Sequence, residues 1–124
     1  MAKIAVVEDN DAMREQLCGF IAQYARESGR QLDVTAFADG AEIVDPYRPG
    51  FDIIFLDIEM PTLGGMPTAE RIRQVDPDVV LVFVTNMAQY AIRGYEVDAL
   101  DFVLKPVSYY QFSTKLERAL QRIR

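Results

Sequence analysis

Five short apolar runs alternate with segments of helical periodicity along the chain. The first, third and fourth runs contain unbroken stretches of apolar residues, which is typical of strands covered on both faces of a parallel sheet. Strand–helix alternation repeated in this way predicts an α/β doubly wound sheet. We therefore expect one α/β domain over residues 1–124, with five parallel strands and five helices. The predicted strands are Lys3–Val7, Leu32–Phe37, Asp52–Leu56, Val79–Val84 and Phe102–Leu104.

The segments between the strands carry helix signals of different strength. The first shows an apolar stripe at i, i+4, i+7, i+8 and i+11. The last repeats this spacing, and Ser108 with Gln111 gives a capping-box pattern at its start, where Val107 can pack on Phe112. The first stripe consists of Met13, Leu17, Phe20, Ile21 and Tyr24, and the last of Phe112, Leu116, Ala119, Leu120 and Ile123.

Turn and cap residues mark three further helices. Asp39 with Glu42 indicates the cap of a short second helix, which Pro46 limits. Gly64-Gly65 opens the third helix, which ends before Asp76-Pro77. The fourth helix, around Met87–Gly94, has the weakest stripe. The inner face of the third helix is expected to consist of Met66, Ala69, Ile72 and Val75.

Composition and charge narrow the possible functions. The net charge is −6, from 19 acidic and 13 basic residues, so the basic patch of a nucleic-acid-binding domain is not expected. The sequence contains no His, the commonest general base and metal ligand. Any chemistry would therefore use carboxylates, hydroxyls and lysine.

Several common classes of protein are also disfavoured. The single Cys18 cannot form an internal disulfide. No apolar run approaches the roughly 20 residues of a membrane span, and no secretory signal pattern follows Lys3. We therefore expect a cytoplasmic protein with no membrane contact.

Polar side chains follow four of the five predicted strands. Glu8-Asp9 follows the first strand, Asp57 the third, Thr85-Asn86 the fourth and Lys105-Pro106 the fifth. In parallel α/β sheets, ligands bind beyond the carboxyl ends of the strands, near the point where the strand order reverses. These residues are therefore expected to meet at one edge of the sheet.

Their chemistry indicates phosphoryl transfer with a metal. Each like-charged pair among Glu8, Asp9 and Asp57 would cost roughly 4 kcal/mol at about 4 Å. A Mg²⁺ ion would relieve that cost, since it prefers oxygen ligands and keeps room for a phosphate. Asp57, alone at the end of a central strand, is the predicted phosphoryl acceptor. Lys105 would offer a charge and Thr85 a hydroxyl to the phosphoryl oxygens.

The chain resembles a response-regulator receiver domain along its whole length. The resemblance rests on Glu8-Asp9, Asp57 followed by Met60-Pro61, Gly65, Thr85, and Lys105-Pro106. It implies a CheY-like, flavodoxin-like sheet of order 2-1-3-4-5. The stretch Thr85–Ser108 further resembles the N-terminal receivers of LytTR-type transcriptional regulators.

The resemblance also implies roles for individual residues. Asp57 would accept a phosphoryl group from a sensor histidine kinase. Asp9, Glu8 through water, and the backbone carbonyl of Glu59 would hold Mg²⁺ with Asp57. The Lys105–Pro106 bond is expected to be cis. Thr85 and Phe102 would form the coupled pair that reports phosphorylation.

Movement of Thr85 and Phe102 is expected to change the shape of a surface built from the fourth helix, the fifth strand and the fifth helix. A changed surface would control an output domain or partner, including a homodimer. The chain would not be an enzyme beyond its own phosphorylation and dephosphorylation. The pattern departs from many relatives at Asn86, which could narrow access to the phosphate, and at Gly64, where an acidic residue is common.

Three alternative functions remain open on the residues alone. Phosphohydrolases with an aspartyl-phosphate intermediate also place an Asp at a strand end, but they typically have an Asp two residues later, where this chain has Glu59. An interaction domain that has lost phosphorylation would not need the full set of polar residues. A flavodoxin-like cofactor-binding protein would have to place a phosphate beside the acidic Glu8-Asp9 loop.

Overall fold

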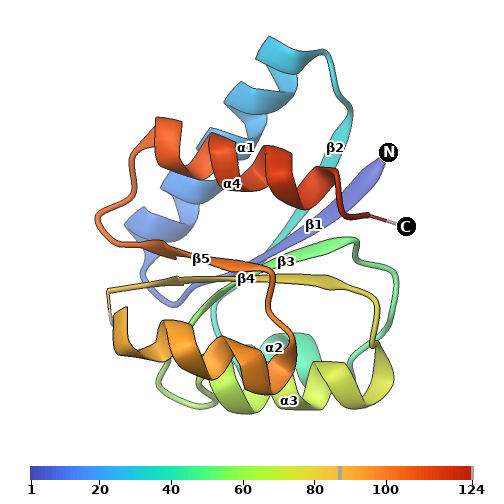
Figure 1. The fold of residues 1–124 in the computed structure, drawn as a ribbon, viewed down its shortest axis with the longest axis vertical. Coiled ribbons are helices and arrows are strands. Elements are labelled where there is room, and N and C mark those ends of the chain that lie inside the picture. Colours follow the sequence, from blue (N-terminus) through green and yellow to red (C-terminus); the bar gives the residue numbers. More distant parts are fainter. Residues whose placement is uncertain (87, 124) are drawn as a thin grey trace.

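The computed structural model describes residues 1–86 and 88–123 and, at residues 90–92, the backbone alone. Within this part of the chain, five strands form one parallel sheet in the order β2-β1-β3-β4-β5 (Figure 1). The predicted strands and the strand order implied by the resemblance are confirmed. The strands are β1 (Ala2–Val7), β2 (Leu32–Phe37), β3 (Ile53–Asp57), β4 (Val80–Thr85) and β5 (Asp101–Leu104).

The helical segments follow the predicted positions, with one difference in type. In the described residues, four are α-helices and the fourth segment along the chain, η1, is a 3-10 helix. Its apolar stripe is the weakest among the predicted helices, and Gly94 within it lowers its α-helical propensity. Met87, the first residue predicted for it, lies outside the described residues. The segments are α1 (Asp11–Ser28), α2 (Gly40–Val44), α3 (Gly65–Val75), η1 (Ala88–Val97) and α4 (Tyr109–Leu120).

Polar side chains cap three of the helices, among them the predicted caps Asp39 and Ser108. Asn10 caps α1 by accepting from Met13 N, Asp39 caps α2, and Ser108 caps α4 by accepting from Gln111 N. One prediction for α3 is wrong, because Val75 is 55% exposed and not on the inner face. Val75 is the last residue of α3 and directly precedes the cap residue Asp76.

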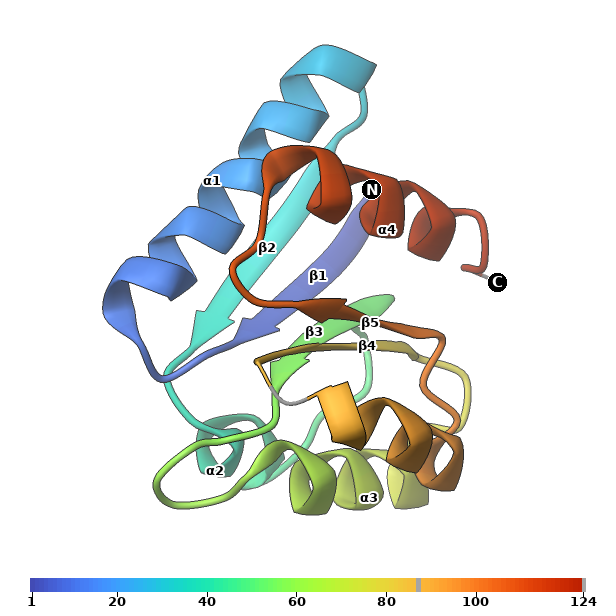
Figure 2. The ribbon, with the colours of Figure 1, turned by 60° about the vertical axis from the view of Figure 1, so that its left-hand side comes forward.

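The helices cover the sheet in two layers (Figures 1 and 2). Helices α1 and α4 lie on one face, and α2, α3 and η1 lie on the other. Each layer encloses its own apolar cluster. The α1/α4 cluster includes Leu17, Ile21, Phe55, Phe112 and Leu116. The α3/η1 cluster includes Ile43, Ile58, Met66, Ile72, Phe83 and Val97.

Arg73 ties α3 to the end of η1. Its Nε donates to Val97 O at 2.7 Å and its Nη2 to Asp98 O at 2.9 Å. Burial lowers the pKa of Arg73, and nearby acids such as Asp98 oppose that effect. This contact fixes one end of the 3-10 segment. Among the helices of the described residues, none is long and apolar enough to cross a membrane.

Candidate functional site

The parallel sheet brings the predicted polar residues to one edge. Glu8 directly follows β1, Asp57 is the last residue of β3, Thr85 is the last residue of β4, and Lys105 directly follows β5. Because all strands point the same way, these positions share one end of the sheet. The juxtaposition expected from the sequence is therefore present.

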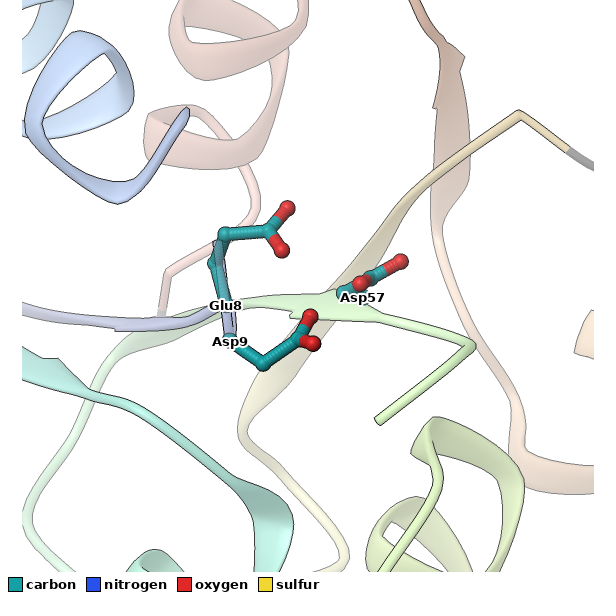
Figure 3. Close-up of side chains that lie close together, drawn as sticks. All are labelled: Glu8, Asp9 and Asp57. Atoms are coloured by element: carbon teal, nitrogen blue, oxygen red, sulfur yellow. The ribbon is translucent and has the colours of Figure 1, made fainter. Parts of the chain in front are cut away.

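Glu8, Asp9 and Asp57 form a compact acidic cluster (Figure 3). One carboxylate oxygen from each of the three lies within 4.8 Å of the others. Figure 3 shows Glu8 and Asp9 extending from the end of β1 toward the region occupied by the Asp57 carboxylate. Glu8 and Asp57 are buried, at 1% and 5% exposure, whereas Asp9 is exposed. The cluster thus has a buried floor and one side open to solvent.

Lys105 neutralises part of this charge. Its Nζ lies 2.7 Å from Glu8 Oε1 and 3.5 Å from Asp57 Oδ1. Burial by itself would lower the pKa of Lys105, but hydrogen bonding to Glu8 and the charge of Asp57 outweigh it and raise that pKa. The lysine is therefore a stable cation within reach of both carboxylates, and in this structure its closer partner is Glu8.

The Asp57 carboxyl is the group that this environment perturbs most clearly. Burial, followed by the negative charge of Glu8, raises its pKa from 3.8 to about 7, while the charge of Lys105 acts in the opposite direction. The pocket therefore stabilises the protonated form of Asp57 relative to the same carboxyl in water. Proton and metal would compete for the same carboxylate.

This pKa predicts an unusual pH dependence of stability. The folded pKa lies above the unfolded value, so the contribution of Asp57 to the stability of the metal-free protein should decrease as pH rises from about 4 to about 7. Asp57→Asn lacks this proton and should become more stable than the native chain by up to about 4 kcal/mol at pH 7.5. Urea unfolding of both proteins in EDTA across this pH range measures the difference. A constant difference at all pH values would contradict the raised pKa.

The donor set fits a hard divalent cation. Three carboxylates supply oxygen ligands, and Mg²⁺ is usually held by one or two carboxylates together with waters and phosphate. Glu8 Oε1 is buried, and the Lys105 ammonium at 2.7 Å is the cation that offsets its charge. A cation near Asp9 and Asp57 would lower the electrostatic cost of this arrangement.

The remaining predicted residues surround the acidic cluster at different depths. Thr85 is buried at 1% exposure, and its carbonyl accepts from Lys105 N at 2.8 Å. Phe102 lies in β5 opposite Phe83, partly buried against the α3/η1 cluster. Glu59 is exposed in the loop that follows β3. These positions are compatible with the roles implied by the resemblance, which stay predictions.

Two backbone features support the cluster. A Cβ at Gly65 would lie 2.2 Å from Asp57 O, so glycine lets α3 begin directly against the end of β3. The Lys105–Pro106 peptide is cis, as the resemblance implied. The Asp45–Pro46 peptide is cis as well, and no feature of the sequence had indicated this.

One residue had a larger role than its sequence pattern suggested. Asp39 was expected only to cap α2, but its carboxylate also accepts from Thr62 N and Leu63 N in the loop after β3. An Asp before a short helix carries no signal for partners more than twenty residues away. The contact could be found only in the structure.

The comparison with protein families decides the family of the chain. The model of the response regulator receiver domain family matches residues 4–117. The chain belongs to this family. Receiver domains have an acidic pocket that binds Mg²⁺, and in this chain Glu8, Asp9 and Asp57 form an acidic cluster. The family is generally one of signalling domains rather than catalysts.

Several relatives resemble this receiver closely. The transcriptional regulatory protein BtsR of Escherichia coli K12 is 32% identical over 128 residues, covering 100% of this chain and 48% of the relative. The sensory transduction protein LytT of Oceanobacillus iheyensis is 31% identical, covering 93% and 46%. The chain spans about half the length of the curated relatives it matches. Both relatives support the resemblance to LytTR-type receivers.

A solved structure agrees with the same assignment. The non-phosphorylated HemR receiver domain of Leptospira biflexa is 30% identical, with a TM-score of 0.87 over 100% of this chain and 98% of that one. Membership of the receiver family decides against the phosphohydrolase and flavodoxin-like alternatives. The interaction domain without phosphorylation remains as an alternative to be tested by experiment.

Proposed function

We propose that this receiver is a phosphorylation switch in which Asp57 accepts a phosphoryl group from a sensor histidine kinase. The observation that carries the proposal is the acidic cluster with Lys105 within reach of both Glu8 and Asp57. An interaction domain without phosphorylation would have no need to bury two carboxylates beside an ammonium. The switch would comprise residues 1–124 and act in the cytoplasm.

The transfer step follows from the position of Asp57. An Asp57 carboxylate oxygen attacks phosphorus and forms an acyl phosphate, while the P–N bond of the donor phosphohistidine breaks. The electron pair of that bond returns to the imidazole nitrogen, which takes up a proton. Asp9, Glu8 and the Glu59 carbonyl would hold Mg²⁺ with Asp57. When bound, the ion supplies positive charge to the phosphoryl oxygens.

Access and charge balance favour Asp57 over its neighbours. Glu8 is buried and paired with Lys105, and Asp9 is exposed, whereas Asp57 is a buried carboxylate at the end of the central strand β3. Lys105 Nζ at 3.5 Å from Asp57 Oδ1 needs only a small shift to contact a phosphoryl oxygen. That contact would be a charge-assisted hydrogen bond.

A partner could approach beside this site. An open groove of about 450 Å³ between α1 and the β5–α4 connection is lined by Asn10, Met13, Gln16 and Lys105. Its mouth includes the same lysine that contacts Glu8. A kinase that occupied this groove would bring its phosphohistidine next to Asp57.

Phosphorylation would change the surface formed by η1, β5 and α4. We infer that Thr85 moves toward the phosphoryl oxygens and that Phe102 moves into the space vacated by Thr85. The surface formed by these three elements exposes Tyr95 at 89% and Leu104 at 44%. Asp101 links β5 to α4 through ion pairs with Lys115 at 2.8 Å and Arg118 at 3.0 Å. This apolar and charged surface suits a second receiver.

A phosphate mimic should therefore change the association state. Beryllofluoride with Mg²⁺ should convert the chain toward a dimer, measured by sedimentation velocity at several concentrations. Tyr95→Ala should weaken the dimer because it removes an exposed ring from the surface, whereas Val75→Ala, on the exposed end of α3, should not. Equal sedimentation with and without the mimic would count against the dimer.

The phosphorylation itself is tested by intact mass. Incubation with acetyl phosphate and Mg²⁺ should add one phosphoryl group to the native chain, and EDTA should prevent it. Absence of the adduct, also with a histidine kinase as donor, would favour the interaction domain without phosphorylation. By analogy with BtsR, named a transcriptional regulatory protein, the switch would control transcription through a DNA-binding output domain.

A further inference from the structure

Asp39 lies at a junction between α2 and the loop that carries Glu59. This loop, residues 58–64, connects Asp57 to α3 and is called here the β3–α3 loop. The Asp39 side chain is buried, at 8% exposure, although it lies outside the acidic cluster. A buried carboxylate needs hydrogen-bond donors to offset its loss of solvent.

The donors come from both sides of the junction. Asp39 Oδ1 accepts from Ala41 N and from Leu63 N, both at 2.9 Å, and Oδ2 accepts from Thr62 N at 3.0 Å. Burial alone would raise the pKa of Asp39, but these three backbone groups outweigh it and hold that pKa below its usual range. The carboxylate is therefore ionised and forms charge-assisted bonds to the loop.

A second contact holds the same junction together. A Cβ at Gly40 would lie 1.8 Å from Thr68 Oγ1 and 2.6 Å from Leu63 O. Thr68 is fully buried and donates from Oγ1 to Gly64 O at 2.8 Å. The start of α2 and the end of the β3–α3 loop are therefore packed without room for a side chain.

These contacts enclose the part of the loop nearest to Asp57. At its base, Gly65 N donates to Ile58 O at 2.8 Å, and at its far side Thr62 N donates to Asp39. Glu59 lies between these two fixed points. Loss of either one would allow the Glu59 backbone to move relative to the acidic cluster.

We propose that Asp39 is a positioning residue for phosphoryl transfer: it holds the β3–α3 loop so that the Glu59 carbonyl stays aimed at the cation site beside Asp57. The inference rests on the proposed function, since it concerns the same site. Removing a partner that bonds a metal ligand directly typically costs about 10- to 100-fold in metal affinity, and Asp39 acts one step further out, through Thr62 and Leu63.

Two substitutions separate the cap from the loop contacts. Asp39→Asn can keep the bonds of Oδ1, but its amide would turn two donors toward Thr62 N. Asp39→Ser can still cap α2 at Ala41 N, and it loses both loop amides. Tyr47→Phe is the stability control, because it removes a half-buried hydrogen bond to Asp76 Oδ2 at 2.7 Å elsewhere in the same layer.

The experiment follows backbone amide signals of the ¹⁵N-labelled full chain. Hydrogen exchange of Thr62 and Leu63 in the metal-free protein reports the loop, and a Mg²⁺ titration of the same samples gives the dissociation constant. Asp39→Asn should weaken Mg²⁺ binding about tenfold and Asp39→Ser should weaken it more. The exchange of the two amides should accelerate in the same order, and Tyr47→Phe should change neither quantity.

The possible outcomes are distinct. Native-like Mg²⁺ affinity in both Asp39 variants, with faster exchange at Thr62 and Leu63, would reduce Asp39 to a structural cap and overturn the inference while leaving the proposed function intact. Equal weakening in Tyr47→Phe would also overturn it, because the effect would then follow stability alone. A native chain without any Mg²⁺-dependent shift would overturn the proposed function as well.

Discussion

Replacing Asp57 with Asn should abolish the phosphoryl adduct that acetyl phosphate and Mg²⁺ form on the native chain. The amide keeps the shape of the side chain and its place at the end of β3, but its oxygen is a far weaker nucleophile. Glu8 cannot replace it, since its carboxylate is paired with Lys105 at 2.7 Å. Intact mass spectrometry at matched times should therefore detect the adduct in the native protein and none in the variant.

A matched control lies at the opposite end of the same strand. Asp52 immediately precedes β3, and its Oδ2 accepts from Lys3 N at 2.8 Å, far from the polar edge of the sheet. Asp52→Asn should retain the adduct at native yield. Persistent phosphorylation of Asp57→Asn would place the acceptor on another residue, and peptide mapping after reduction of the acyl phosphate would identify it.

The second large effect concerns the ion pair between Glu8 and Lys105. Lys105→Met leaves the Glu8 carboxylate, 1% exposed, without its cation. Breaking a buried pair from one side typically costs about 3–5 kcal/mol, so we expect a loss of this order in the metal-free protein. Removing both charges in Glu8→Gln/Lys105→Met should recover most of the loss. Urea unfolding at pH 7.5 in EDTA measures Glu8→Gln, Lys105→Met and the double variant.

The single and double variants of Glu8 and Lys105 form a double-mutant cycle. The exposed ion pair of Arg93 and Glu96 serves as its comparison. Its side chains are 46% and 53% exposed and 3.3 Å apart, so its coupling free energy should be below about 1 kcal/mol and should fall with added salt. The coupling of Glu8 with Lys105 should be larger and nearly independent of salt. Additive effects of Glu8→Gln and Lys105→Met would show that the two groups do not interact in the folded protein.

Much of the fold could be predicted because its signals are local. Unbroken apolar runs identified the buried strands, and caps such as Asn10 and Ser108 act within one helical turn. The site could be predicted for a related reason. Parallel strands deliver the residues after their carboxyl ends to one edge, so Asp57 and Lys105 could be placed together without knowing any distance.

The remaining features depend on packing between distant segments. An apolar stripe does not distinguish an α-helix from the 3-10 geometry of η1, since both present similar faces over a few residues. The preference of Lys105 for Glu8 over Asp57 is decided by a difference of less than 1 Å in side-chain placement. Likewise, Asp39 has the same sequence pattern whether or not it also binds Thr62.

The two apolar clusters lie on opposite faces of the sheet. Ile58 and Met66, which flank the loop after Asp57, belong to the same cluster against which Phe102 packs. Leu17 and Phe112 belong to the other cluster, and the sheet lies between the two. A rearrangement that starts at the loop can therefore reach β5 through contacts within one apolar cluster. The surface around α1 could then stay constant for one partner while the surface around η1 changes for another.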